Sequence, residues 1–418
     1  MKRIFLAWLA LGLLASSAPS GAGEVVPDLP AITILETVLT HHPGVQREQE
    51  ALQGAAATLA SRKMQRLPGL SFEALTGEDD QDKAVASLVQ PIWVGGRIRN
   101  AITGARTRLR LAEISLAGIQ RDLVERTLLV LADLEGLENQ IRAGEKNRDE
   151  HQRLLELISR RRRGKIASRV DVRLGQSRLS QARLTLRDLK GKHQRARNDL
   201  LALTRVPVSP VFPLPDFLGQ VPGLDPALDQ VTRNAPDLAM ARGEIESATA
   251  EAALKKSQLL PRLYGKLEQE IYNGRGYADT GRDTTLALVV EASLDGAGLS
   301  QWQEVKAARA GIRAARMSAR ASEIEISRQT RSLVTDIALY QGMVALNRDL
   351  VASTAGTLAS YARQYEAGRK RWLDLLNIQQ EHARARLALE QAATTLARTK
   401  LKLAVRLGRL DPPCRIRL

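Results

Sequence analysis

The stretch that decides the fold is LRLAEISLAGIQRDLVERTLLVLADLEGLENQI, residues 109–141. Its apolar side chains recur at spacings of three, four and once seven residues, the pattern of a coiled-coil seam. The seam consists of Leu109, Ala112, Leu116, Ile119, Leu123, Val130, Leu134, Leu137 and Ile141. A second stripe beside it consists of Leu111, Ile114, Leu128 and Leu131. Two stripes predict neighbours on both sides, which suits a helix in the wall of a tube; a filled bundle is the alternative.

The helix continues far beyond this stretch, because the chain has no proline between Pro91 and Pro207. A second proline-free stretch lies between Pro261 and Pro412. Proline breaks helix interiors, so such stretches of helix-forming residues predict extended helical hairpins. The 68 residues from Gly96 to Arg163 would form a helix of about 100 Å. We therefore predict a mainly α fold with a small β part.

The chain repeats itself at about half of its length. HHPGVQ (41–46) corresponds to NAPDLAM (234–240), and RLPGLSFEAL (66–75) to LLPRLYGKLEQE (259–270), both at an offset of 193 residues. QPIWVGGRI (90–98) corresponds to EASLDGAGL (291–299) at an offset of 201, and RRRGK (161–165) to YEAGRK (365–370) at about 204. Four landmarks in the same order indicate an internal duplication.

Five segments follow from this repeat. Lys2 and Arg3 precede an apolar run and then small residues, which predicts an export signal peptide over 1–23, cleaved near Ala22 or Gly23. We expect a first repeat at 24–205, a proline-rich linker at 206–226, a second repeat at 227–410 and a tail at 411–418. No later stretch approaches the roughly 20 apolar residues of a transmembrane helix, so membrane insertion would have to use β-strands.

Each repeat contains two predicted strands: Gly69–Thr76 and Lys83–Gln90, then Arg262–Tyr272 and Thr284–Leu294. In the third strand, Leu263, Leu267 and Ile271 alternate with polar residues, which predicts one apolar and one polar face. Closed transmembrane barrels need about eight strands or more, and open edges are not tolerated in lipid. Four membrane strands would have to combine with those of other copies, which predicts an oligomer.

Composition argues against several other functions. The net charge of +16 comes from Arg-rich helix faces rather than one basic block, so we expect solvated surface and no nucleic-acid partner. The single cysteine, Cys414, cannot form an internal disulfide. Nucleophile motifs, phosphate loops and zinc patterns are missing. The five histidines show no metal-ligand spacing: His41, His42, His151, His193 and His382. We expect a protein that is not an enzyme and holds no metal or cofactor.

At these residues the chain resembles the TolC family of outer-membrane export channels. The resemblance covers about residues 30–410 and is carried by QPIWVGGRI (90–98), YEAGRKRWLDLLNIQQE (365–381) and the Leu-Pro breaks at Pro68 and Pro261. It implies a homotrimer in the bacterial outer membrane with a large periplasmic portion. Three copies would supply twelve strands to one β-barrel, and the helical hairpins would form an α-barrel closed at its tip. The strand-to-helix turns would be Gly95 with Gly96, and Gly296 with Gly298. The implied partners are a periplasmic adaptor (membrane fusion) protein, an inner-membrane ABC or RND transporter, and outer-membrane lipid.

The resemblance also implies a periplasmic gate at the hairpin turns marked by Gly164 and Gly368. Its residues would be Tyr365, Arg369 or Lys370, and Asp374, whose three copies would form a carboxylate ring. Asn377 stands where the family has a second acidic residue, so we expect weaker cation selectivity, as the arginines at 160–163 also suggest. Asp171 would serve in the first turn, but it follows Gly164 by seven residues, whereas Asp374 follows Gly368 by six. Alternatively, Ser168 and Asp171 form a helix-capping box.

The motif with Trp372, Leu376 and Asn377 is most similar to the branch that serves type I secretion of large surface adhesins. An outer-membrane channel of an RND multidrug efflux pump is the alternative. A periplasmic adaptor or a soluble coiled-coil scaffold are alternatives from other classes. The duplication counts against the first of these, and the signal peptide against the second.

Overall fold

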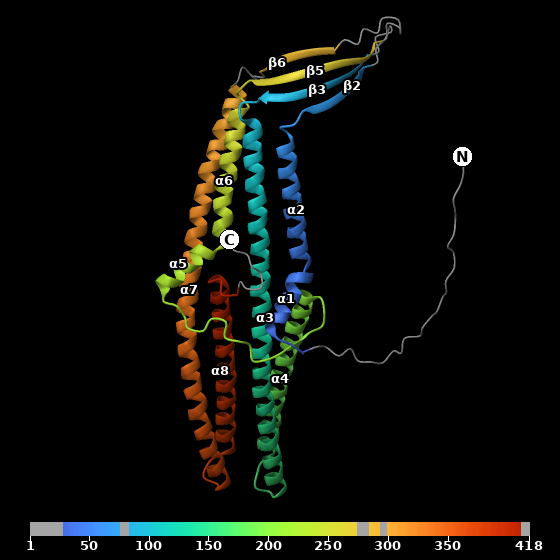
Figure 1. Cartoon of the computed structure of the whole chain (residues 1–418). Helices are drawn as coiled ribbons and strands as arrows, with labels where there is room; N and C mark the ends of the chain where they lie inside the picture. The colour runs from blue at the N-terminus through green and yellow to red at the C-terminus, as the bar shows by residue number, and fades with distance from the viewer. Residues whose placement is uncertain (1–27, 76–82, 274–283, 293–298, 411–418) are drawn as a thin grey trace, which may run out of the picture.

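The computed structural model describes residues 28–75, 83–273, 284–292 and 299–410. The predicted signal peptide, Gly296, Gly298 and the tail with Cys414 lie outside the described residues. Long helices run from a tip at one end to a small sheet at the other (Figure 1). The predicted fold, mainly α with a small β part, is confirmed.

Four long helices form two antiparallel hairpins. They are α3 (Arg97–Arg163), α4 (Arg169–Thr204), α7 (Leu299–Glu366) and α8 (Trp372–Arg406). With 67 residues in α3 and 68 in α7, each of these helices is about 100 Å long. The two proline-free stretches therefore form the helical hairpins that the sequence predicted.

Two shorter helices precede each strand pair. They are α1 (Ala31–His41) and α2 (Pro43–Met64), then α5 (Leu224–Asn234) and α6 (Pro236–Ser257). Pro43 and Pro236 each occupy the first turn of a new helix, where proline's missing N–H costs nothing. At the first break, the Nδ1 atom of His42 accepts a hydrogen bond from the backbone N–H of Gly44 at 3.0 Å. Because α5 begins at Leu224, the last residues of the predicted linker are helical.

The helices lie side by side in a layer that has two open edges. Near the tip their order is α4, α3, α8 and α7; near the sheet it is α2, α3, α6 and α7. The central α3 has neighbours on both sides, as its two apolar stripes predicted. It buries 18 residues, whereas α7, which is of similar length, buries only six. One long side of α7 is therefore left uncovered in the single chain.

The linker crosses the middle of this helical layer (Figure 1). It includes β4 (Ser209–Pro210), which pairs in parallel with β1 (Asp28–Leu29), two very short strands that the sequence did not predict. Val208 and Leu218 from the linker are buried against the helices. The linker thus joins the two repeats by packing as well as by covalent connection.

The four longer strands form one antiparallel sheet in the order β2, β3, β5, β6. Their bounds are Gly69–Leu75, Lys83–Trp93, Arg262–Asn273 and Thr284–Glu291. The predicted ends Thr76 and Leu294 lie outside the described residues. Strand β3 continues beyond the predicted end at Gln90, and its pairing with β5 changes register between Pro91 and Trp93. Such an irregularity is where a strand tolerates proline.

Two adjacent rows of side chains that cross the sheet differ in polarity. Leu70 pairs with Leu88, Leu88 with Leu267, and Leu267 with Leu286, so one row of leucines crosses all four strands. All four leucines are exposed in the single chain. The adjacent row, which points the other way, consists of Ser71, Ser87, Glu268 and Thr285. Along these two rows, the alternation predicted for β5 continues into the neighbouring strands.

In the described part of the chain, none of the helices carries an apolar stretch that could cross a bilayer.

Candidate functional site

The two hairpin turns lie close together at the tip (Figure 1). In the second turn, Gly368 has φ +74° and the N–H of Arg369 bonds to the carbonyl of Gln364. In the first turn, the same bond runs from Ile166 to Arg161, and the left-handed residue is Lys165, with φ +62°, rather than Gly164. Both turns thus end a helix with the same left-handed cap.

This geometry removes the one-residue offset between the two turns. Lys165, and not Gly164, is the structural equivalent of Gly368, so Asp171 follows its left-handed residue by six positions, as Asp374 does. Asp171 and Asp374 are therefore equivalent positions in the two repeats. The sequence could not show this, because glycine marks the left-handed position in only one of the turns.

Both carboxylates cap the start of a helix. The Oδ2 atom of Asp171 accepts from the N–H of Ser168 at 3.1 Å, and the Oγ of Ser168 accepts from the N–H of Asp171 at 3.1 Å. This is the capping box that the sequence offered as the alternative role for Asp171. The Oδ2 of Asp374 likewise accepts from the N–H of Arg371 at 3.4 Å and lies 3.5 Å from its guanidinium Nε.

An aromatic pair holds the two turns together. Tyr365 and Trp372 are both buried, with ring centroids 5.5 Å apart. The indole Nε1 of Trp372 donates to the backbone carbonyl of Asp171 at 3.2 Å, which connects the α7–α8 hairpin to the α3–α4 hairpin. Leu376 is fully buried in the same cluster. Two of the three residues of the predicted secretion motif therefore form the core of the tip.

Cations cover this aromatic core. The guanidinium of Arg161 lies 4.3 Å from the ring centroid of Tyr365 and donates to the carbonyls of Tyr365 and Glu366. The Nζ atom of Lys370 lies 4.3 Å from the ring centroid of Tyr361. Both distances allow cation–π attraction. Tyr365 and Lys370 were predicted together, but within one chain they contact different partners, while Arg369 and Asn377 are exposed. Arg161 and Tyr361 were missed, although Tyr361 precedes Tyr365 by one helical turn.

The strand-to-helix turn before α3 requires glycine. Gly95 and Gly96 have φ values of +60° and +81°. A Cβ atom on Gly95 would lie 2.6 Å from the Cβ of Leu260, so the turn also packs tightly against the Leu-Pro break of the second repeat.

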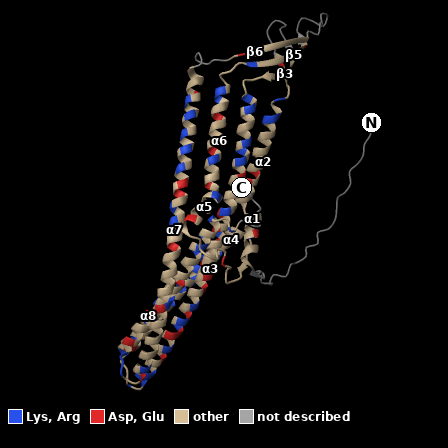
Figure 2. Ribbon diagram, turned by 60° about the vertical axis from the view of Figure 1, so that its left-hand side comes forward, with Lys and Arg blue, Asp and Glu red and all other residues tan. Residues whose placement is uncertain are grey.

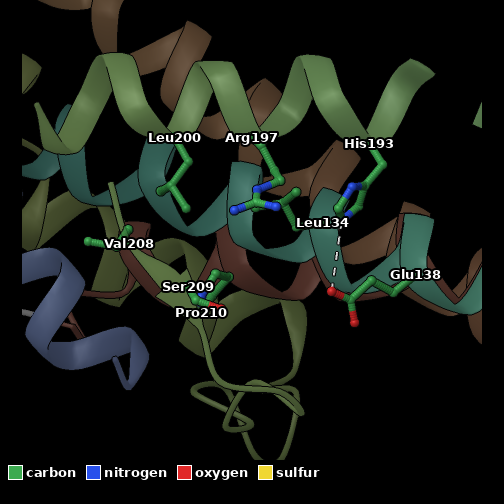
Figure 3. Close-up of a pocket in the computed structure, with 8 residues that line it drawn as sticks. All are labelled: Leu134, Glu138, His193, Arg197, Leu200, Val208, Ser209 and Pro210. Atoms are coloured by element: carbon green, nitrogen blue, oxygen red, sulfur yellow. Dashed lines mark ion pairs between the residues drawn. The ribbon is translucent and has the colours of Figure 1, made fainter. Parts of the chain in front are cut away.

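Within the described residues, no group of three or more His, Cys, Asp or Glu side chains is placed to hold a metal ion. Burial lowers the pKa of His151, with a further contribution from the nearby Arg178, and burial also lowers the pKa of His42 and His382. A cavity of about 70 Å³ lies where α3, α4 and the linker meet (Figure 3). His193 and Glu138 lie together at one end of its lining, with Nε2 and Oε1 3.8 Å apart. A cavity of this size holds water rather than cargo.

The comparisons with known proteins fit this architecture. The sequence model of the outer membrane efflux protein family matches residues 34–204 and 227–409. The chain belongs to this family. The two matched spans correspond to the two helical repeats, and the residues left out between them include the linker. The resemblance to TolC-like channels is confirmed, and family members are outer-membrane channels rather than enzymes. A periplasmic adaptor or a soluble scaffold is therefore excluded.

Solved structures of outer-membrane channels share this efflux-family fold. The channel OprN superposes with a TM-score of 0.82 at 18% identity, covering 90% of this chain and 89% of that one. VceC from Vibrio cholerae gives 0.78 at 16% identity, covering 90% and 96%. CmeC from Campylobacter jejuni gives 0.76 at 12% identity, covering 95% and 91%. No curated protein sequence matches the chain.

Proposed function

We propose that this efflux-family protein forms a homotrimeric duct through the outer membrane. The duct would receive cargo from a periplasmic adaptor protein and an inner-membrane transporter. The observation that carries this proposal is the pair of open edges in the single chain. The helical layer ends at α7 on one side and at α2 and α4 on the other, and the sheet ends at β6 and β2. A head-to-tail ring of copies would join one set of edges to the other.

The uncovered side of α7 has the pattern of an interface. Leu339, Met343, Leu346 and Leu350 are all exposed, at spacings of four, three and four residues. This is a coiled-coil seam without a partner in its own chain. A soluble surface rarely carries such a stripe, whereas a neighbouring copy would bury it. The stripe therefore favours helix-to-helix contact between protomers.

The sheet supports the same assembly. Unpaired strand edges are not tolerated in a bilayer, and barrels of about eight or more strands close without them. Three copies would supply twelve strands, in which the exposed leucine row faces lipid and the row with Ser71 and Glu268 faces the lumen. The sheet and the helical layer therefore both have edges that a trimer would close.

A single charged substitution in the exposed apolar stripe of α7 tests the proposed trimer. Leu346→Glu, at a residue 71% exposed in the single chain, would bury an unpaired carboxylate in every protomer contact, at a cost of several kcal/mol. We expect monomers by native mass measurement in detergent. Gln341→Glu, at an exposed position on another face of the same helix, is the matched control and should remain trimeric. A trimeric Leu346→Glu protein, or a monomeric parent, would contradict the proposed assembly.

We further propose that the tip is the gate of this duct. Tyr365, Lys370 and Arg369 lie beside the turns through which neighbouring hairpins would meet, and Asp171 and Asp374 occupy equivalent positions on the two hairpins. Exposed polar links are weak, about 0–1 kcal/mol each, but three copies multiply them. Tyr365→Phe combined with Lys370→Ser should raise the conductance of the closed channel in planar bilayers. Unchanged conductance would remove these two residues from the gate.

For the cargo, we propose type I secretion of a large surface polypeptide, supported by the similarity of the tip motif with Trp372, Leu376 and Asn377 to that branch. The second candidate is efflux of small toxic compounds through an RND pump, and the family description, outer membrane efflux protein, names efflux without naming a pump or a cargo. Deletion of the gene separates the two. Type I secretion predicts that one large polypeptide disappears from the cell surface while drug sensitivity is unchanged. Increased sensitivity with normal surface proteins would favour the RND pump.

A further inference from the structure

The tip carries a large excess of positive charge. Residues 160–174 and 361–375 contain eleven Lys and Arg but only three acidic residues, Asp171, Glu366 and Asp374, which leaves +8. The whole chain has +16, so these 30 residues supply half of its net charge. Basic residues occur along the full length of the long helices (Figure 2), but there acidic residues offset more of them.

Two of the three acidic groups at the tip are already engaged by nearby groups. Asp171 accepts from the N–H of Ser168, and Asp374 accepts from the N–H of Arg371 beside its guanidinium. Neither carboxylate contacts the run of four arginines that ends α3. Arg371 is itself one of the eleven basic residues, so the net charge of +8 already includes its pairing with Asp374.

Most of the basic groups face water. Arg161 and Lys370 lie over the rings of Tyr365 and Tyr361. The other nine are all exposed: Arg160, Arg162, Arg163, Lys165, Arg169, Arg173, Arg363, Arg369 and Arg371. Arginine stays ionised at any physiological pH. Because nine of the eleven basic residues are arginines, most of the positive charge at the tip is permanent.

We propose that the periplasmic mouth of the channel selects anions, so that the favoured cargo is acidic. This inference rests on the proposed trimeric duct, in which three tips would bring a net charge of +24 to one entrance (3 × 8). Exposed charges act over about 8–10 Å at physiological salt, so a residue at the rim influences the entrance without pointing into it. Rings of Arg and Lys give anion preference in pores. This proposal is stronger than the expectation from Asn377, which was only that the preference for cations is weaker.

The expected effect is large enough to measure. A mouth potential of only about one kT enriches monovalent anions over cations about sevenfold, and clefts lined by one sign of charge reach several kT. A polypeptide bears many charges, so an acidic segment gains more from this potential than a single ion does. The basic mouth would therefore capture the acidic part of a polypeptide first.

The reversal potential of the purified full-length trimer in planar bilayers tests this proposal. Under a tenfold KCl gradient, we expect its sign to show preference for chloride. Arg162→Gln, Arg163→Gln and Lys165→Gln together should move it towards potassium. The matched control loses three charges at the opposite end of the helices, through Arg62→Gln, Lys63→Gln and Arg66→Gln, and should keep the selectivity of the parent protein. High salt should weaken the preference, because it screens the charges.

A peptide probe tests the cargo directly. Oligoglutamate should block the current at a concentration several-fold lower than oligolysine of equal length, and the three tip substitutions should reduce this difference. A parent channel that prefers potassium, or tip variants that match the parent, would overturn the inference while leaving the duct in place. Trimers that insert but carry no current would overturn the proposed duct itself, and the anion selection with it.

Discussion

Trp372 offers a direct test of how the two hairpins are coupled. Its indole is buried, packs on Tyr365 and donates to the carbonyl of Asp171 on the other hairpin. Trp372→Phe keeps an aromatic ring but removes the donor, which should cost about 0.5–1.5 kcal/mol. Trp372→Ala also removes the packing, for a total of about 3–5 kcal/mol. Because about 1.4 kcal/mol corresponds to a factor of ten, local opening should become roughly 2–12 times more frequent in the first variant and more than 100 times in the second.

Hydrogen exchange measured by mass spectrometry on the intact protein reports this opening. The decisive peptide covers residues 161–175, because it belongs to the hairpin that does not contain the substitution. We expect faster exchange there in both variants, and more so for Trp372→Ala. Leu373→Ala, at the half-exposed neighbouring position, is the control and should leave this peptide unchanged. Faster exchange confined to residues 365–376 would refute the coupling between the hairpins.

Three further predictions follow from packing, burial and charge. A Cβ atom on Gly136 would lie 2.5 Å from the Cγ2 of Thr394, so Gly136→Ala should lower thermal stability by about 1–3 kcal/mol. Gly118→Ala in the same helix meets only ordinary contact and should be neutral or stabilising; equal melting temperatures would contradict the tight α3–α8 packing. The pKa of His151 is lowered from 6.5 by burial and by Arg178. The unfolded chain therefore binds this proton more readily, so stability should fall as pH drops below about 6.5, and His151→Gln should reduce that fall in denaturant titrations. Asp374→Ala removes three carboxylates from the trimer and should shift the reversal potential further towards anions; no shift would place Asp374 outside the conducting path.

The sequence by itself determined the elements and their chemical faces. Proline-free stretches with heptad spacing predict long helices, because they contain neither the prolines nor the irregular patterns that interrupt a helix. Alternation in β5 defined the two faces of the sheet, because side chains in a strand point to opposite sides in turn. The helix breaks at Pro43 and Pro236 were also encoded, through proline at the first helical position.

Only the tertiary structure decided which faces meet. Heptad spacing shows that a helix has an apolar stripe but not which partner covers it, so the neighbours of α3 and the uncovered stripe on α7 were not predictable. The equivalence of Asp171 and Asp374 depends on the left-handed backbone of Lys165, a residue type that gives no such signal. The bond from Trp372 to Asp171 joins residues 201 positions apart, and its carbonyl partner is common to every residue. Local sequence fixes local geometry, whereas contacts between distant segments depend on how the two repeats pack together.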